Sequence, residues 1–405
     1  MRPTPHHAAR PKPRVLIDAT ALRALSGFRG IGRYTQELLL GLAALGDDLP
    51  FTALAATSLA PLRFSTDLAA LVEESEAERG ALSNRVFMQR RFALGAALAT
   101  TGARALHMPQ AYGMPLARVG CLIVTCHDLI PLEMPEHYLG LALGSRRYGA
   151  RTVGFSVRLA RDLVRYRRAD HVICISERTR QSLTRFCQVD DARLSVVYNS
   201  ASRFERAPLA AVDSGAAPYV LYVGYCDPRK DIRSLFAALA LVNRRHALRL
   251  AWAAALLPHD RAKMVALARA MGVEDRVDFL GFVSDERLRG LYAGAVALVF
   301  PSRLEGFGLP VLEAMAAGCA VIVTRDSGAD EVAGASGFVV DPERPDQLAE
   351  AIAVLHHDAA RRDLAQREGR TRARTFTRDA MARGTAAAYL RALALHEGLA
   401  PAAQP

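Results

Sequence analysis

The 405-residue chain lacks the features that mark several common classes of protein. No uncharged apolar stretch reaches the roughly 18 residues that a membrane-spanning helix requires. Residues 1–13 lack the apolar segment of a secretory signal peptide, and we expect them to form a disordered arm. No D-x-D or C-x-x-C pair is present, and no His/Cys cluster has the spacing of a zinc site. These absences favour a cytoplasmic protein without a metal cofactor.

Further motifs are missing, and two residue types are scarce. Neither G-x-S-x-G nor G-x-x-x-x-G-K-[ST] occurs, which removes support for a serine hydrolase or a P-loop protein. Of the 52 basic residues only Lys12, Lys230 and Lys263 are lysines, which leaves 49 arginines. We interpret the six cysteines as small core residues in a reducing compartment. They are Cys121, Cys126, Cys174, Cys187, Cys226 and Cys319.

The composition is that of a globular protein with a basic first half. Apolar residues make up 51% and charged residues 23% of the chain, and the length favours two domains. The net charge is +11, and residues 1–213 hold 28 basic and 19 acidic side chains. An anionic partner would therefore approach the first half. Nucleic acid is disfavoured because aromatic residues are few and no reading motif is present.

The strongest concentration of basic charge lies in residues 145–168. This stretch holds eight arginines and one aspartate, with apolar residues between them. A basic amphipathic helix of this kind can lie on an anionic membrane surface. An ordinary surface helix with a solvated arginine-rich face explains the pattern equally simply.

Strand-like apolar runs alternate with helical patterns in both halves of the chain, which predicts parallel sheets covered by helices. The fold class is α/β, with two Rossmann-like, doubly wound domains facing each other across a cleft. In the first half, strands are expected at 15–19, 51–57, 104–108, 121–126, 171–176 and 195–199. In the second half, they are expected at 219–224, 248–253, 276–281, 295–301, 320–324 and 337–341. The expected divisions are a first domain 14–205, a linker 206–218, a second domain 219–375, a helix 376–395 that returns to the first domain, and a tail 396–405.

One loop of the second half has the pattern of a sugar or nucleotide site. A strand runs into Glu305-Gly306-Phe307-Gly308, and a helix begins at Leu309. The amides at a helix start favour an anion such as a phosphate. The carboxylates of Glu305 and Glu313 cannot neutralise a phosphate, but they can accept hydrogen bonds from sugar or ribose hydroxyls. Alternatively, Glu313 caps helix amides and Glu305 is solvated.

A second loop carries an adjacent basic pair. The strand that ends at Gly224 is followed by a turn with Asp227, and Arg229 and Lys230 stand at the next helix start. Basic side chains are disfavoured there by the helix dipole, so the pair points to a diphosphate partner. The alternative is a solvated pair that forms ion pairs with Asp231 or Asp227.

The first half offers two weaker signals. The glycine-rich turn at 27–32 follows the first strand and only loosely resembles a dinucleotide-binding turn. His127 and Asp128 follow a buried strand at the edge where parallel sheets bind ligands. His127 could bind a substrate or act as an acid or base, or could simply be hydrogen-bonded at a strand end.

Taken together, several segments resemble glycosyltransferase family 4, the retaining, nucleotide-sugar-dependent enzymes of the GT-B architecture. In the second half these are VGYCDPRKD, the region from VDFLGFVSDERL to GCAVIV, and GFVVDPERPDQLAEAI. In the first half, GIGRYTQEL, HDLIPLEMPEHY and HVICISERTRQSL resemble bacterial mannosyltransferases that build O-antigen and other surface polysaccharides. The resemblance covers about residues 14–375 and is strongest over 219–341.

The resemblance implies roles for individual residues. Those with implied catalytic roles are Arg229 and Lys230 on the donor diphosphate, Glu305 on the sugar hydroxyls and His127 on the donor sugar. Those expected to bind the donor are Gly30, Gly32, Gly224, Gly281, Phe282, Val283, Gly306, Phe307, Gly308, Leu309 and Glu313. Among these, Gly281, Phe282 and Val283 would lie against the base, and Glu313 would hold the ribose. The family often has Asn where this chain has Asp231, and Pro where it has Asp330 before Glu331.

The implied reaction is transfer of a hexose with retention of configuration and without metal. GDP-mannose is the favoured donor, and UDP- and dTDP-sugars are the alternatives. The acceptor would be a glycan or a lipid diphosphate, and the protein would lie peripherally at the inner membrane. Two other readings are an inactive GT-B module in a glycan-assembly complex and a phosphorylase. The second needs a pyridoxal-phosphate lysine, and only three lysines exist.

Overall fold

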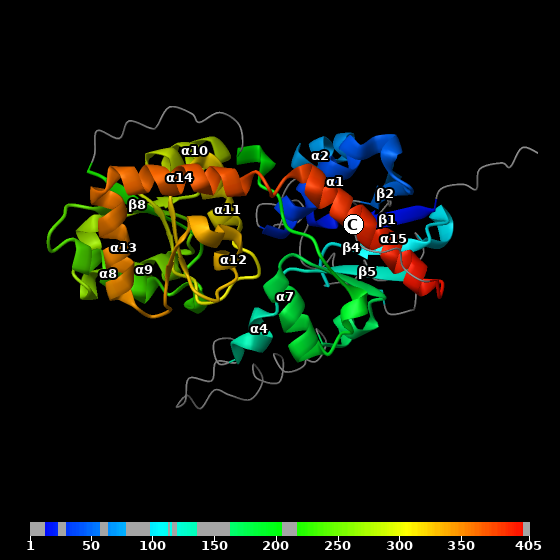
Figure 1. Ribbon diagram of the computed structural model, residues 1–405, viewed down its shortest axis with the longest axis horizontal. Coiled ribbons are helices and arrows are strands. Elements are labelled where there is room, and N and C mark those ends of the chain that lie inside the picture. The colour runs from blue at the N-terminus through cyan, green and yellow to red at the C-terminus, as the bar shows by residue number, and fades with distance from the viewer. Residues whose placement is uncertain are drawn as a thin grey trace, which may run out of the picture.

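The computed structural model describes residues 13–22, 30–56, 64–77, 98–111, 114–115, 120–135, 163–204 and 217–399. Within these ranges the chain forms two sheets flanked by helices, which lie side by side in Figure 1. We call the sheet that precedes residue 200, with its helices, the first unit, and the sheet that begins at Tyr219 the second unit.

The first unit contains a seven-stranded sheet with the order β3-β2-β1-β4-β5-β6-β7. All its neighbouring strands are parallel except β2 and β3. Every residue of β4, β5 and β6 is buried, as expected for a parallel sheet covered on both faces. The strands are β1 Arg14–Asp18, β2 Thr52–Ala56, β3 Phe64–Ser65, β4 Ala105–Met108, β5 Cys121–Cys126, β6 His171–Cys174 and β7 Leu194–Val196.

The second unit contains a six-stranded parallel sheet with the order β10-β9-β8-β11-β12-β13. This is the doubly wound order, in which the direction of winding reverses between the first strand, β8, and the fourth, β11. Ligands of such sheets bind at that point, beyond the carboxyl ends of the strands. The strands are β8 Tyr219–Val223, β9 Arg249–Ala253, β10 Val277–Gly281, β11 Leu298–Phe300, β12 Val321–Thr324 and β13 Phe338–Val340.

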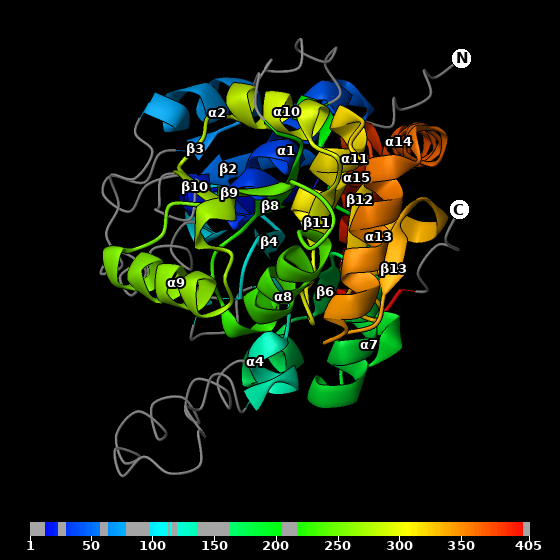
Figure 2. The ribbon, with the colours of Figure 1, turned by 90° about the vertical axis from the view of Figure 1, so that its left-hand side faces the viewer.

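The helices cover the sheets with apolar faces. In α8, for example, the buried residues Ile232, Leu235, Phe236 and Leu239 recur at helical spacing. Figure 2, which looks onto the second unit, shows α8 beside α13. The helices are α1 Gly30–Leu45, α2 Leu68–Ala77, α4 Ile130–Glu133, α7 Glu177–Ser182, α8 Ile232–Val242, α9 Pro258–Ala270, α10 Asp285–Gly294, α11 Leu309–Ala317, α12 Ala329–Ala333, α13 Pro345–His357, α14 Ala359–Ala373 and α15 Arg378–His396.

The last helix lies on the first unit although the chain has already passed through the second. In Figure 1, α14 runs along the second unit and α15 continues over α1. The Arg378 guanidinium donates two hydrogen bonds of 2.9 Å to Glu37 of α1, whose side chain is buried. Gly41 of α1 allows close packing, since a Cβ atom there would lie 2.9 Å from Cβ of Ala382. The helix α15 therefore joins the two units.

The α/β fold class predicted from the sequence is confirmed, and most elements lie within a few residues of their expected positions. The short antiparallel strand β3 was not predicted, because its two residues carry no periodic pattern. Of the basic stretch 145–168, only residues 163–168 are described, and they are helical. The N-terminal arm 1–12 and the segment 205–216 lie outside the described residues, and the domain boundaries remain predictions.

Candidate donor-binding site

A cavity of about 780 Å³ lies between the two units, at the carboxyl ends of the second sheet. Gly30 and Arg33 of α1 line it from the first unit. The second unit contributes the loops after β8, β9 and β10 and the first turns of α11. These lining residues are Val223, Gly224, Tyr225, Asp227, Arg229, Lys230, Ala253, Ala254, Ala255, Gly281, Phe282, Val283, Leu288, Leu309, Pro310 and Glu313.

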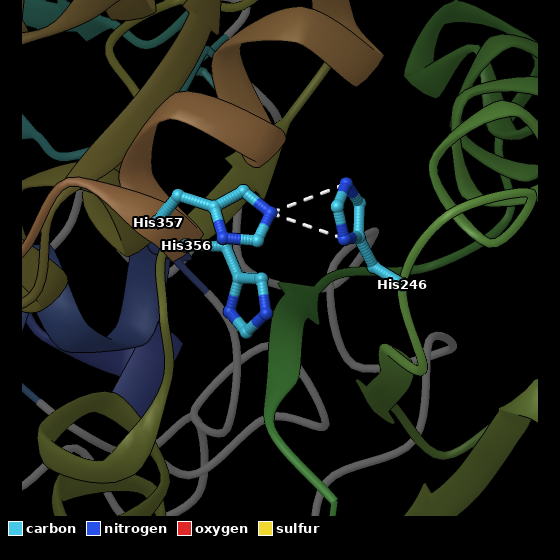
Figure 3. Close-up of side chains that lie close together, drawn as sticks. All are labelled: His246, His356 and His357. Carbon is cyan, nitrogen blue, oxygen red and sulfur yellow. Dashed lines mark hydrogen bonds between the residues drawn. The ribbon is translucent and has the colours of Figure 1, made fainter.

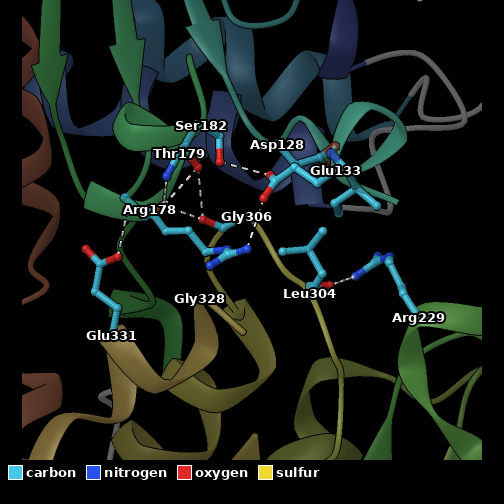
Figure 4. Close-up of polar contacts among 12 residues, drawn as sticks. Asp128, Glu133, Arg178, Thr179, Ser182, Arg229, Leu304, Gly306, Gly328 and Glu331 are labelled. Carbon is cyan, nitrogen blue, oxygen red and sulfur yellow. Dashed lines mark hydrogen bonds and ion pairs between the residues drawn. The ribbon is translucent and has the colours of Figure 1, made fainter. Parts of the chain in front are cut away.

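Arg229 and Lys230 share one buried carboxylate, that of Glu305. Nη1 of Arg229 lies 2.6 Å from Oε2 of Glu305, and Nζ of Lys230 lies 2.5 Å from Oε1. Arg229 also donates from Nη1 to the carbonyl oxygen of Leu304, as Figure 4 shows, while its Nε lies 3.5 Å from Asp227. Nζ of Lys230 lies 4.5 Å from the centre of the Phe300 ring. The pair is thus held rigidly by β11 and the loop that follows it.

The charge of Glu305 is stabilised by this pair. Burial would raise the pKa of the Glu305 carboxyl, but the positive charges of Lys230 and Arg229 outweigh it and lower the pKa to about 2. Glu305 is therefore ionised at neutral pH. Its contacts are with the basic pair, and it lies behind Arg229 and Lys230 rather than among the cavity-lining residues. Arg229 and Lys230 both line the cavity, so their remaining donor hydrogens can take a further acceptor.

A second carboxylate, Glu313, lines the cavity from α11. Its side chain is only 2% exposed, and it accepts a hydrogen bond of 2.9 Å from Nη1 of Arg33. Nη2 of the same guanidinium lies 3.0 Å from Asp285 at the start of α10. Arg33 thus connects the first unit to two carboxylates of the second. Motif reasoning missed Arg33; its only signal was a basic residue on the first turn of the helix after the glycine-rich turn.

The loop after β10 forms one rim of the cavity. Gly281 has a φ of +70°, which favours glycine, and this turns the chain toward the cavity. The neighbouring Phe282 is 70% exposed, an unusual position for a large apolar ring. The ring is available to stack on a flat ligand group. This rim matches the segment that the family resemblance places against a nucleotide base.

The loop 304–308 forms one of the contacts between the two units. The carbonyl oxygen of Gly306 accepts hydrogen bonds from the hydroxyls of Ser176, at 2.6 Å, and Thr179, at 3.3 Å. A Cβ atom on Gly306 would lie 1.7 Å from the carbonyl oxygen of His127, so no side chain fits there. Figure 4 shows this loop reaching toward α7. Gly306 therefore lets the second unit approach the first.

The two departures from the family pattern are accommodated locally. Asp231 adopts the left-handed conformation with a φ of +47° and caps α8 by accepting from the Ser234 amide at 3.2 Å. Asn and Asp share both abilities, so the replacement keeps the geometry. Asp330 accepts from the amides of Asp326 and Gly328 at 2.7 and 3.0 Å and so orders its loop without proline.

Glu331, the residue after this departure, binds across the unit boundary. Its carboxylate accepts from the amides of Glu177 and Arg178, the first residues of α7, at 2.8 and 3.1 Å. The Tyr198 hydroxyl donates to the same carboxylate at 2.9 Å. A carboxylate is favoured at a helix N-terminus. The second unit thus caps a helix of the first, a contact that sequence reasoning did not predict.

His127 lies at the end of β5, outside the set of cavity-lining residues. Its Nε2 donates to the carbonyl oxygen of Pro109 at 2.7 Å, and its ring packs edge-on against Tyr34. Removal from water lowers the pKa of His127 to about 4, so the imidazole is neutral at pH 7. Nδ1 is then the nitrogen with a lone pair, because Nε2 carries the proton.

The structure brings most of the predicted donor-binding residues to one cavity. Those that line it are Gly30, Gly224, Arg229, Lys230, Gly281, Phe282, Val283, Leu309 and Glu313. Gly32 is buried in α1, and Gly308 starts α11 with a φ of +99°. Phe307 is buried against Tyr198 and Phe376 rather than in the cavity. Five of the six predicted core thiols are buried, and Cys226 is partly buried and packs against the core of the second unit.

Comparison with known proteins identifies the fold and the family. Two family models match the chain, Glycosyltransferase Family 4 over residues 28–202 and Glycosyl transferases group 1 over residues 210–372. O-antigen chain mannosyltransferase B of Escherichia coli is 35% identical over 163 residues, which are 39% of this chain and 42% of that protein. O-antigen chain mannosyltransferase RfbU of Salmonella typhimurium is 28% identical over 251 residues, which are 60% of this chain and 65% of that protein. The chain thus matches less than two thirds of the length of either relative.

The architecture also matches solved structures. Sucrose-phosphate synthase from Thermosynechococcus elongatus superposes with a TM-score of 0.73 at 20% identity, covering 95% of this chain and all of that one. Two doubly wound sheets with a cavity between them, joined by a returning C-terminal helix, define the GT-B class of glycosyltransferase folds. Within this class, the chain carries a Glycosyltransferase Family 4 domain followed by a Glycosyl transferases group 1 domain. No helix in the described part of the chain is both long and apolar enough to cross a bilayer.

Proposed function

We propose that the protein is a retaining glycosyltransferase that transfers a hexose from a nucleotide sugar to a glycan or lipid-linked acceptor. The observation that carries the proposal is the cavity between the units, where Arg229, Lys230 and Glu313 converge beside the exposed ring of Phe282. Basic groups suit a diphosphate, a buried carboxylate suits ribose hydroxyls, and an aromatic ring suits a base. One nucleotide sugar satisfies all three.

In this proposal the basic pair stabilises the leaving group. The guanidinium of Arg229 and the ammonium of Lys230 would bind the diphosphate as its bond to the anomeric carbon breaks. Glu305 keeps both cations in place, which preorganises the site for the charge that develops. The acceptor hydroxyl would attack from the face that the diphosphate leaves, so the configuration is retained and the leaving phosphate oxygen takes the proton.

We also propose that donor binding requires no divalent ion. Lys230, Arg229 and the amides at the start of α11 supply positive charge and dipole at the place where the diphosphate would lie. Turnover should therefore persist in EDTA. A strict requirement for Mg²⁺ or Mn²⁺ would contradict this part of the proposal.

Mannose from GDP-mannose is the favoured donor sugar, because the relatives with matching segments are named O-antigen mannosyltransferases. We place the reaction in the assembly of bacterial surface polysaccharides on the same ground. UDP- and dTDP-sugars are the alternatives within the same mechanism. The likeness to sucrose-phosphate synthase supports the fold and does not bear on the donor.

We further propose that the acceptor is lipid-linked and that the protein binds peripherally to an anionic membrane. Residues 136–162, which hold most of the basic stretch, lie outside the described residues. In residues 163–168, the described end of the basic stretch, Arg167 donates to the carbonyl oxygen of Cys187 at 2.8 Å, and Arg165 is buried. These two arginines serve the first unit, so a membrane contact would need the others. Flotation with anionic vesicles tests it, and absence of binding with acceptor present would contradict it.

The direct test of the proposed function is turnover with a panel of nucleotide sugars. We expect transfer or slow hydrolysis with GDP-mannose, with the α-configuration retained in the product by NMR. Arg229→Ala and Lys230→Ala should each lower kcat by about 10²–10³. Activity is measured below the unfolding transition of both variants, because each loses an ion pair to buried Glu305. Activity with none of the donors would favour the reading of an inactive module.

A further inference from the structure

Three histidines that are distant in the sequence lie together on the second unit, away from the donor cavity. His246 follows the C-terminal end of α8, and His356 and His357 are the last residues of α13. In Figure 3 the ring of His357 faces that of His246, with His356 beside them. Nε2 of His357 lies 3.0 Å from Nδ1 of His246 and 3.2 Å from its Nε2. One ring nitrogen of each histidine lies within 4.8 Å of those of the other two.

These spacings approach those of a metal site. Zinc binds imidazole nitrogen at about 2.0–2.1 Å in a tetrahedron, which puts two ligand nitrogens about 3.4 Å apart. His246 and His357 already meet this spacing. His356 is only partly buried, so its ring can turn inward by the remaining distance. The backbone segments that carry the rings are held together, since α8 and α13 pack against each other.

The charges around the cluster decide which ions suit it. The C-terminal ends of α8 and α13 carry partial negative charge, which favours a cation. The guanidinium of Arg362 donates to the carbonyl oxygens of Leu355 and His356 at 2.7 and 3.2 Å. Its positive charge therefore lies close to the cluster and opposes a cation there. The affinity must therefore come from the nitrogen lone pairs. This excludes Mg²⁺ and Ca²⁺, which prefer oxygen, and favours Zn²⁺, Ni²⁺ or Cu²⁺.

We propose that His246, His356 and His357 bind one divalent transition-metal ion of the zinc class, with a fourth position open to water. The ion would join the C-terminal ends of α8 and α13. The other end of α8 begins directly after Arg229 and Lys230, so the ion would stabilise the helix that follows the basic pair. Its role is structural and independent of the proposed transfer reaction.

The test is a titration of the tag-free full-length chain with Zn²⁺ by calorimetry, and with Co²⁺ followed by visible absorption. His6 and His7, which lie outside the described residues, are replaced by alanine in every protein so that they cannot contribute. His246→Ala and His357→Ala are compared with the control His259→Ala, an exposed histidine outside the cluster. Thermal unfolding is measured with and without Zn²⁺.

We expect one Zn²⁺ per chain, a rise in unfolding temperature on binding, and tetrahedral Co²⁺ bands. Each cluster variant should bind at least about tenfold more weakly and lose the thermal shift, while the control keeps both. Binding of GDP should be the same in all variants, which separates this site from the donor site. No Zn²⁺ binding by the unsubstituted cluster, or equal binding by the cluster variants, would overturn the proposal.

Discussion

The charged side chains of the donor cavity neutralise one another before any donor binds. Arg33 is paired with Glu313 and Asp285, and Arg229 and Lys230 share Glu305. In the proposed function, the diphosphate binds Arg229 and Lys230 while Glu305 keeps both cations in place. At the scale of single residues, we expect Arg33 to orient the Glu313 carboxylate, which the proposed function assigns to the ribose hydroxyls.

Glu305 predicts a specific dependence of stability on pH. Its folded-state pKa of about 2 lies below the usual 4.5, so its ionisation stabilises the fold above pH 4.5. That contribution, about 3 kcal/mol at most, is lost as the pH falls through 4.5 toward 2. Unfolding temperatures between pH 6 and pH 3 should fall more steeply for the native chain than for Glu305→Gln. Parallel curves would contradict the assigned ion pairs.

The residues that sequence motifs identified were those whose roles are set within one loop. Arg229, Lys230, Glu305 and Glu313 lie on two loop–helix segments of one unit, and the chain order already places these loops at one sheet edge. Arg33 was missed because its contacts depend on how the two units approach each other. No local pattern encodes that distance.

At the scale of elements, the loop between β11 and α11 serves the cavity and the unit boundary together. Gly306 has no room for a side chain, because a Cβ atom would lie 1.7 Å from the His127 carbonyl oxygen. We expect Gly306→Ala to push the units apart, cost about 1–3 kcal/mol and lower turnover. Gly369→Ala in α14 is the matched control, since its Cβ would lie 3.4 Å from Met315. Equal unfolding temperatures and activities for both variants would refute this role.

Most elements were predictable because strand and helix patterns alternate strictly along the chain. The prediction failed for β3, which is a two-residue edge strand, and the helix predicted over 177–187 is α7 followed by a π-helical turn over Leu183–Cys187. Both depend on backbone hydrogen bonds rather than on side-chain periodicity. Element positions follow from pattern, whereas irregular ends follow from their surroundings.

At the scale of the whole molecule, two separate contacts join the two units. In the first contact Arg378 of α15 binds Glu37 of α1, and in the second Glu331 accepts hydrogen bonds from the first amides of α7. Sequence analysis predicted the returning terminal helix that makes the first contact, but it did not predict the second contact. Contacts of this kind, like the histidine cluster, join residues more than 100 positions apart.

The contact of Glu331 with α7 predicts how a change at this residue affects the association of the two units. Glu331→Gln removes the charge that favours the N-terminus of α7, which should weaken the contact between the two units by about 0.5–1 kcal/mol. Hydrogen exchange at the amides of Glu177 and Arg178 should become faster, and the donor KM should rise. Unchanged exchange at these two amides would show that the carboxylate does not hold the units together.

The most direct test of the donor site is a calorimetric titration of GDP, UDP, dTDP and ADP in EDTA into the native chain and Glu313→Ala. We predict metal-independent binding with GDP preferred, and at least about tenfold weaker binding by the variant, because the ribose loses a charged hydrogen-bond acceptor. Preference for UDP or dTDP would change the donor and keep the site. Absence of nucleotide binding, or equal affinity in a folded Glu313→Ala protein, would contradict the assignment of this cavity.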